Sequence, residues 1–341
     1  MSAVALTTLT FVTASDLPAQ PQALSLALVW LLFMVIAGLP LAFVEAMIVR
    51  RGRALPLQGL AAVTRDSDAS TVWRLLAPLS MIVLIGMIAI GVHHSTNGLV
   101  VTDNTAIAAQ AFPYLFVFLA MGFAWVGMRR LLAFVGILVP AALAINALLA
   151  PHTGLLVLLT PEQWQQAATA ALVTNMSTLG LYAWLVMTRL VDTRATQTIL
   201  PLWLTQTIVG MATIAAGTAQ GNLSVIVYML TAVFACALLA EVVAQQLQAK
   251  DVAKPVAIGV VMLAAAGATA LTQFSLFTTV VTVVALVTML GFSVFLGWVV
   301  KTSHVRKALN FNSEAIYNLW RVGVRLVAPI TILWLLVSMM L

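Results

Sequence analysis

The placement of Lys and Arg along the chain is the feature that most restricts its fold. Ten long apolar segments alternate with short polar connections, and the sixteen Lys and Arg residues fall only at alternate connections. They occupy Arg50 to Arg74, Arg129–Arg130, Arg189 and Arg194, Lys250 and Lys254, and Lys301 to Arg325. Cytoplasmic loops retain Lys and Arg, whereas translocated loops avoid them. The pattern predicts a multi-pass protein of the plasma (bacterial inner) membrane whose basic loops are cytoplasmic.

The apolar segments are long enough to be transmembrane helices, which need about 20 residues to cross the hydrocarbon core. The predicted spans are 24–49, 73–92, 105–128, 131–150, 166–188, 197–217, 222–246, 255–272, 276–300 and 316–341. Only helices and closed barrels satisfy the backbone in lipid, so we predict an all-α integral membrane protein of about ten helices. This order places the C-terminal Leu341 outside.

The first residues do not fit this series. Residues 3–13 are apolar but too short to span, and we expect a half-helix, a re-entrant piece or an interfacial segment. Residues 1–23 are therefore predicted as a short external or re-entrant segment. Residues 24–341 are predicted as a single transmembrane domain.

The composition excludes several functional classes. Apolar residues make up 62% of the chain and charged residues 8%, against about 25% charged in soluble domains. The net charge of +6 follows from the basic loops, so the expected partner is the lipid bilayer and not nucleic acid. A single cysteine, Cys236, excludes an internal disulfide framework and a cysteine metal cluster. No phosphate-loop, HExxH or GxSxG motif is present, so we predict no enzymatic activity and no metal site.

Two carboxylates lie inside predicted spans, where ionisable side chains are costly and point to function. Glu45 is expected either to bond to a neighbouring helix or to the adjacent arginines, or else to couple a proton or an ion. Glu241 is expected at a helix interface, reaching toward water. Thr205, Gln206 and Thr207 are expected to hydrogen-bond between helices.

The segment 167–190 carries the strongest site signal. Thr174, Asn175, Ser177, Thr178 and Gly180 gather near the middle of one span. Ser, Thr and Asn compete for backbone hydrogen bonds, and Gly loosens a helix. One interpretation is a helix broken at the midplane, which is how many secondary transporters build a substrate site. The other is an unbroken helix whose polar groups bond to neighbouring helices.

Several stretches resemble the neurotransmitter:sodium symporter family. GLPLAFVEAMIVRRG (38–52) is similar to its second helix, and GMRRLLAFVGILVPAALAINALL (127–149) to its short loop and fifth helix. LTPEQWQQAATAALVTNMSTLGLYAW (159–184) resembles its unwound sixth helix, and IYNLWRVGVRLVAPITILWLLV (316–337) its eleventh. The resemblance covers most of 24–341 in order.

The resemblance implies a LeuT-type fold with a truncated first helix. It implies two inverted repeats, roughly 1–150 and 163–300, and an extra helix at 316–341. The substrate would lie at the break near Thr174–Gly180, with Asn175 and Ser177 as candidate contacts. Glu45, with Gly38 and Pro40 of the same stretch, would support the unwound region.

The chain departs from the family where sodium and substrate are usually held. The Gly-Asn break and the Arg-Phe-Pro motif of the first helix are missing, and 84–92 lacks the third-helix tyrosine. The sodium motif of the eighth helix is replaced by 234–237, which has no side-chain oxygen. The family implies sodium, but its usual ligands are lost, and we expect no other cofactor.

Two functions remain open on the sequence. One is a divergent secondary transporter of a small solute, such as an amino acid, with sodium coupling in doubt. The other is a transport-incompetent membrane subunit or scaffold for a partner protein. The chain could also be a fragment whose real first helix lies upstream.

Overall fold

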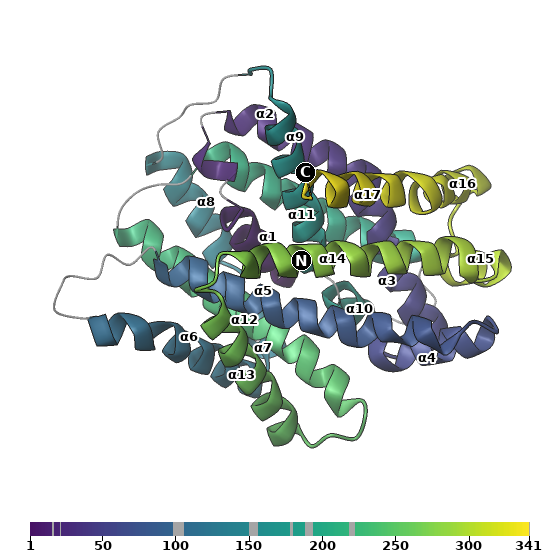
Figure 1. Ribbon diagram of the computed structural model, residues 1–341, viewed down its shortest axis with the longest axis horizontal. Helices are drawn as coiled ribbons and strands as arrows, with labels where there is room; N and C mark the ends of the chain where they lie inside the picture. The colour runs from purple at the N-terminus through teal and green to yellow at the C-terminus, as the bar shows by residue number, and fades with distance from the viewer. Residues whose placement is uncertain are drawn as a thin grey trace.

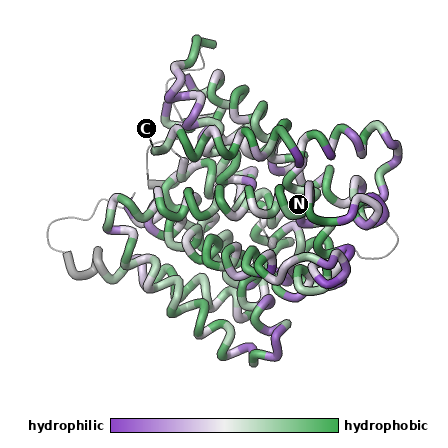
Figure 2. The backbone as a smooth tube through the Cα atoms, turned by 45° about the vertical axis from the view of Figure 1, so that its right-hand side comes forward, coloured by the Kyte–Doolittle hydropathy of each residue, from purple (hydrophilic) through white to green (hydrophobic). Residues whose placement is uncertain are grey.

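The computed structural model describes residues 1–15, 17–20, 22–97, 106–149, 156–177, 180–187, 194–217 and 222–340. These residues form helices joined by short turns, and no β-strand occurs among them. Figure 1 shows a single bundle of long helices, and Figure 2 shows hydrophobic residues along most of their length. The prediction of an all-α multi-pass membrane protein is confirmed.

Nine described helices or helix series are long and apolar enough to cross a membrane. They are α2–η2–α3 (Ala23–Phe33, Met34–Gly38, Leu39–Gly52), η3–α5 (Thr71–Leu75, Leu76–Asn97), α7–α8 (Met128–Val135, Leu138–Leu149), α9–α10 (Pro161–Ser177, Leu181–Met187), α11 (Ala195–Ala216), α12 (Asn222–Gln248), α13 (Lys254–Leu271), α14–η5 (Leu276–Val294, Phe295–Val299) and α16–η6–α17 (Glu314–Val322, Gly323–Val327, Ala328–Ser338). The remaining predicted span, 105–128, is α6 (Ala106–Val126).

The N-terminal segment is a short helix inside the bundle. Helix α1 (Ser2–Thr13) has every residue from Ala3 to Val12 buried. It packs against α9, α11 and α12, and the 3₁₀ turn η1 (Leu17–Ala19) follows it. The prediction that residues 1–23 form an external or re-entrant segment stays a prediction.

Local sequence signals set the helices at the basic loops. Helix α4 (Pro56–Asp66) begins with a proline, which needs no N–H partner at that position. The hydroxyl of Ser313 caps α16 by accepting the N–H of Ile316 at 3.3 Å. Helix α15 (Thr302–Leu309) ends at Asn310, whose φ of 45° is left-handed, a conformation that asparagine tolerates.

Helices α5 and α12 pack against each other, and two further contacts, α1 with α11 and α9 with α2, mirror one another. Helix α12 contacts α5, α6, α13 and α1, whereas α1 packs on α11 and α9 packs on α2. This pairing is the one expected if α1 and α9 occupy equivalent places in two inverted repeats. The repeat boundaries 1–150 and 163–300 stay a prediction.

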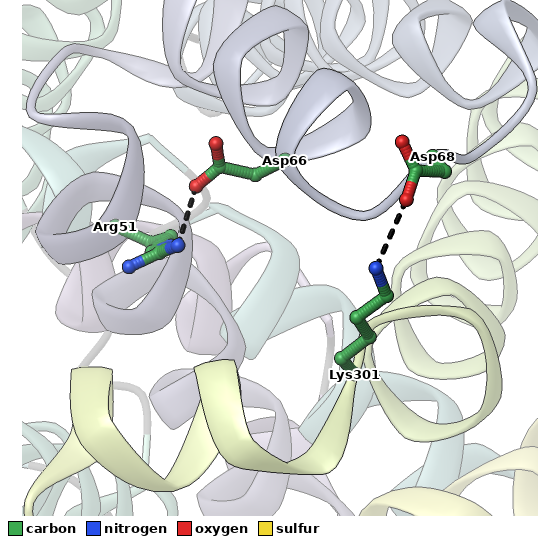
Figure 3. Close-up of polar contacts among 4 residues, drawn as sticks. All are labelled: Arg51, Asp66, Asp68 and Lys301. Carbon is green, nitrogen blue, oxygen red and sulfur yellow. Dashed lines mark hydrogen bonds and ion pairs between the residues drawn. The ribbon is translucent and has the colours of Figure 1, made fainter.

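Salt bridges tie the basic loops together at one end of the bundle, which we call the basic end. Helices α4, α15 and α16 lie at the right-hand end of Figure 1. Figure 3 shows Arg51 bonded to Asp66 at 2.6 Å and Lys301 to Asp68 at 2.9 Å. A third bridge joins α15 to α16. These contacts connect the α3–α4 region to α15, which is far away in sequence.

We predict that the Asp68–Lys301 pair makes stability depend on pH. The hydrogen bond and charge of Lys301 hold the pKa of Asp68 below its ordinary value. Its contribution is therefore present above the unfolded pKa, about 3.9, and is lost as pH falls through the folded pKa. Asp68→Asn should lower the unfolding temperature in detergent at pH 7, and the difference should vanish in acid.

Asp251→Asn is the matched control, because Asp251 is also an exposed, left-handed loop aspartate. No salt bridge involves Asp251 among the described residues. An equal effect of both substitutions at every pH would refute the role of the pair.

We also predict that Gly52→Ala weakens the α3–α4 contact. An added Cβ at Gly52 would lie 2.5 Å from the Cα of Gly59 and 2.7 Å from its carbonyl oxygen. Because backbone cannot yield as a side chain can, the cost should be about 1–3 kcal/mol. Gly259→Ala, which meets no atom within 4 Å, should leave the unfolding temperature unchanged.

Candidate functional site

The polar segment in the middle of the α9–α10 series interrupts its helix. Helix α9 ends at Ser177, and α10 begins at Leu181. Gly180 has a φ of 78°, a backbone angle that residues other than glycine rarely adopt. Of the two interpretations of this segment, the broken helix is the one observed. Thr178, a predicted contact, lies outside the described residues.

Glu45 bonds to the backbone at the start of α10. Its Oε2 accepts the N–H of Gly180 at 2.8 Å and that of Ala183 at 3.1 Å. The side chain is 4% exposed, so the two N–H groups have no access to bulk water. The first N–H groups of a helix lack intrahelical partners, and a carboxylate is a strong acceptor for them. The adjacent Arg50 bonds elsewhere, to the carbonyl of Ala308 at 2.7 Å.

Gln206 joins the two halves of the broken helix. Its Nε2 donates to the carbonyl of Thr174 on α9 at 3.0 Å, and its Oε1 accepts the hydroxyl of Tyr182 on α10 at 2.7 Å. Gln206 lies on α11 and is fully buried. The expectation that this side chain bonds between helices is confirmed, and its position bridging the break was not foreseen.

A third set of contacts fixes α10 from the side. Trp184 donates through Nε1 to Gln245 Oε1 at 2.7 Å, and Gln245 donates to Glu241 Oε1 at 2.9 Å. The other oxygen of Glu241 accepts the N–H of Met128 at 2.6 Å, at the start of α7. The guanidinium of Arg129 lies 4.7 Å from the Trp184 ring centre. Glu241 therefore caps a helix and is 9% exposed, which corrects the expectation that it reaches toward water.

The predicted contact residues are brought together, but they are packed. The hydroxyl of Thr174 donates to the carbonyl of Ala170, and that of Ser177 to the carbonyl of Thr174, both at 2.7 Å. Asn175 and Glu45 line a small void of about 10 Å³ between α9, α3 and α14. These described residues therefore face their neighbouring helices.

Gly38 and Pro40 lie beside this group, on η2 and α3. A Cβ at Gly38 would lie 3.2 Å from Met34 Sδ and 3.7 Å, an ordinary van der Waals distance, from Asn175 Oδ1. The carbonyl of Pro40 accepts the Nε1–H of Trp320 at 3.0 Å. The π-helical turn η2, Met34–Gly38, ends between these contacts.

A cavity of about 520 Å³, which we call the vestibule, opens above the break. Helices α1, α5, α9 and α14 form its walls. Its polar lining residues are Ser15, Glu162, Gln165, Gln166, Thr169, Thr278 and Thr282. The α9 members recur every three or four positions, which places them on one face of the helix. This face passes from exposed Glu162 to half-buried Val173, one turn before Ser177.

Sequence reasoning missed this polar face. The predicted span began at residue 166, whereas Glu162 lies in the first turn of α9 and lines the vestibule. The spacing of Glu162, Gln165, Gln166 and Thr169 was the available signal, since it repeats at the helical period.

Thr8 on α1 was also missed. It is fully buried, and its Oγ1 has no hydrogen-bond partner among the described residues. Buried polar groups are nearly always paired, so this hydroxyl needs an explanation. Thr8 lies three positions before Phe11 and seven before Ser15, both of which line the vestibule. It therefore continues the same helix face below the vestibule floor.

Residues 234–237, which the resemblance would place at a sodium position, carry no side-chain oxygen, the ligand type that a hard cation takes. Ala235, Cys236 and Ala237 are fully buried in α12. The Cys236 thiol contacts the carbonyl of Ile88 at 3.7 Å, and a Cβ at Gly91 would lie 3.1 Å from its sulfur. This contact closes the space between α12 and α5.

We predict that Glu45→Ala destabilises the protein far more than Glu45→Gln. Alanine leaves the N–H groups of Gly180 and Ala183 buried without an acceptor, which costs about 1–3 kcal/mol for each group. Glutamine retains one acceptor oxygen and the side-chain volume. Thermal unfolding in detergent measures both variants. A small effect of Glu45→Ala would mean that another group bonds to the start of α10.

No family model matches the chain, and no curated protein matches it. Its structure is similar to the crystal structure of MhsT in complex with L-phenylalanine. The similarity has a TM-score of 0.69 and covers 98% of each chain, at 15% sequence identity. At this identity the similarity establishes the architecture alone. The chain is thus a multi-pass membrane protein with a LeuT-type fold.

Proposed function

We propose that this protein is a secondary transporter that carries a small solute across the membrane. The observation that supports this function most strongly is the broken helix α9–α10 directly below the vestibule. A break exposes backbone groups to a ligand where lipid could not satisfy them. The side chains of Glu45 and Gln206 hold the two halves of the broken helix in register.

The solute would enter through the vestibule and pass between α1 and α9. Along α1, Thr8, Phe11 and Ser15 form one face, and along α9 the face runs from Glu162 to Val173. The Thr8 hydroxyl would form a hydrogen bond with the bound solute. The predicted set of Thr174, Asn175, Ser177, Thr178 and Gly180 would then shape the break around the solute.

The chemistry of the vestibule favours a small solute with both polar and apolar parts. Amide and hydroxyl groups of Gln165, Thr169 and Thr282 lie beside apolar Phe11 and Met87. An amino acid fits this lining, and MhsT, which shares the fold, was crystallised with L-phenylalanine. We propose transport without sodium bound at 234–237, because that position lacks side-chain oxygens.

The membrane orientation belongs to the same proposal. The basic end would face the cytoplasm and the vestibule the outside, because Lys and Arg are retained in cytoplasmic loops. Leu341 would then lie outside, and the membrane would be the plasma or bacterial inner membrane.

Thr8→Val tests the function, because valine keeps the shape of threonine and removes the hydroxyl. The unfolding temperature would be measured in detergent with each common amino acid, with and without sodium. A ligand that binds only the folded protein raises this temperature. We expect a sodium-independent rise with one or a few amino acids, reduced in Thr8→Val by about tenfold in affinity, since a hydrogen bond contributes about 1 kcal/mol and more to a charged group.

Thr10→Val is the matched control. Thr10 is equally buried and its hydroxyl also has no partner among the described residues, but it lies about 200° around α1 from Thr8. It should leave the ligand response unchanged, and neither variant should be less stable without ligand. No response to any amino acid would favour a scaffold that binds a partner protein. A sodium-dependent response would refute the proposed coupling.

A further inference from the structure

A second cavity lies on the opposite side of α1 from the vestibule. Its volume is about 150 Å³, and helices α1, α5, α8 and α12 enclose it. Leu9 and Thr13 of the α1 region line this second cavity, whereas Phe11 and Ser15 line the vestibule. Successive residues turn by about 100°, so positions two apart point to opposite sides of the helix. Helix α1 therefore separates the two cavities.

Three hydroxyl groups on the wall of this cavity have already used their hydrogen. Thr13 donates to the carbonyl of Leu9 at 2.8 Å, Tyr228 to that of Thr10 at 3.2 Å, and Ser95 to that of Gly91. A hydroxyl has one hydrogen and two lone pairs. Once the hydrogen is directed to a carbonyl, the oxygen offers only lone pairs to a ligand. The cavity is therefore rich in acceptors.

The charges around the cavity favour a cation over an anion. Helices α1, α5, α8 and α12 contain no Lys or Arg residue. Among the described residues, no Lys or Arg lines the cavity. The rings of His94 and Tyr228 meet edge to face at 5.7 Å on one wall. An aromatic face attracts a cation.

Apart from Asn146 and Ser224, which have other interactions, the rest of the lining is apolar. Leu9, Ala142, Ile145 and Val225 complete the wall on three of the four helices. A cavity of this volume holds a molecule of about six heavy atoms, as the benzene-binding cavity of the same volume in a lysozyme variant illustrates. A ligand that matches both halves of the wall has a short apolar chain and one group that only donates hydrogen bonds.

We propose that this cavity binds a small aliphatic ammonium ion of about four to six heavy atoms. The ammonium group donates to the oxygens of Thr13, Ser95 and Tyr228, and the alkyl chain packs on Leu9 and Ile145. This site goes beyond the proposed transport function and does not depend on it. Occupancy would also press on α1 from the side away from the vestibule.

The test uses the unfolding temperature of the full chain in detergent, titrated with n-butylammonium chloride. Sodium chloride at equal ionic strength and 1-butanol are the reference compounds. We expect a saturable rise with n-butylammonium alone. Thr13→Val removes one acceptor at nearly constant volume. It should raise the half-saturating concentration of n-butylammonium at least tenfold, because a hydrogen bond to a charged group is lost. Ala142→Leu, which fills the cavity, should abolish the rise.

Thr278→Val is the control, because Thr278 lines the vestibule and not this cavity. It should leave the n-butylammonium response intact. If Thr13→Val fails to fold, Ser95→Ala provides the same comparison. The proposal is overturned if n-butylammonium gives no rise, if 1-butanol gives an equal rise, or if the response survives in Thr13→Val and Ala142→Leu. Loss of the response in Thr278→Val would place the amine in the vestibule and would also overturn it.

Discussion

The backbone groups freed at the break between α9 and α10 impose the constraint on which the site depends. In a membrane-spanning bundle these groups cannot be satisfied by lipid, so side chains from other helices must bond to them. Glu45 on α3 accepts two N–H groups of α10, and Gln206 on α11 donates to the last turns of α9. Glu45 and Gln206 reach these groups only if α3 and α11 pack directly against the break.

The same reasoning explains why α10 is held so firmly. It has seven residues, too few to be stable alone, and it obtains its order from its neighbours. Glu45 fixes its start, Gln206 holds Tyr182, and Gln245 holds Trp184. Glu241 then joins this group to the start of α7, so that α7, α10 and α12 form one connected unit. Helix α1, in contrast, lies between two cavities and has few polar contacts to its neighbours.

Much of the fold could be predicted from the sequence, and the site only in part. Hydropathy located the spans, and the clustering of Thr174, Asn175, Ser177 and Gly180 located the break. Composition does not tell which face of a helix a side chain occupies, so the cluster by itself does not give the orientation of its members. Asn175 lies against Gly38 and Glu45, away from the vestibule, because the neighbouring helix faces are set by long-range packing. Thr8 drew no notice in a segment rich in threonine.

The sequence by itself determined that the chain is a membrane protein, where its long apolar helices lie, and the place where one helix breaks. These follow from local properties: apolar length, and the effect of glycine and hydroxyl groups on a helix. Only the tertiary structure decided that residues 2–13 form a buried helix, that Gln206 bridges the break, and that Glu241 caps α7. The two hydrogen bonds join residues that are far apart in the sequence, and residues 2–13 are buried by several other helices. Such contacts depend on how the helices pack, and neighbouring residues in the sequence do not determine them.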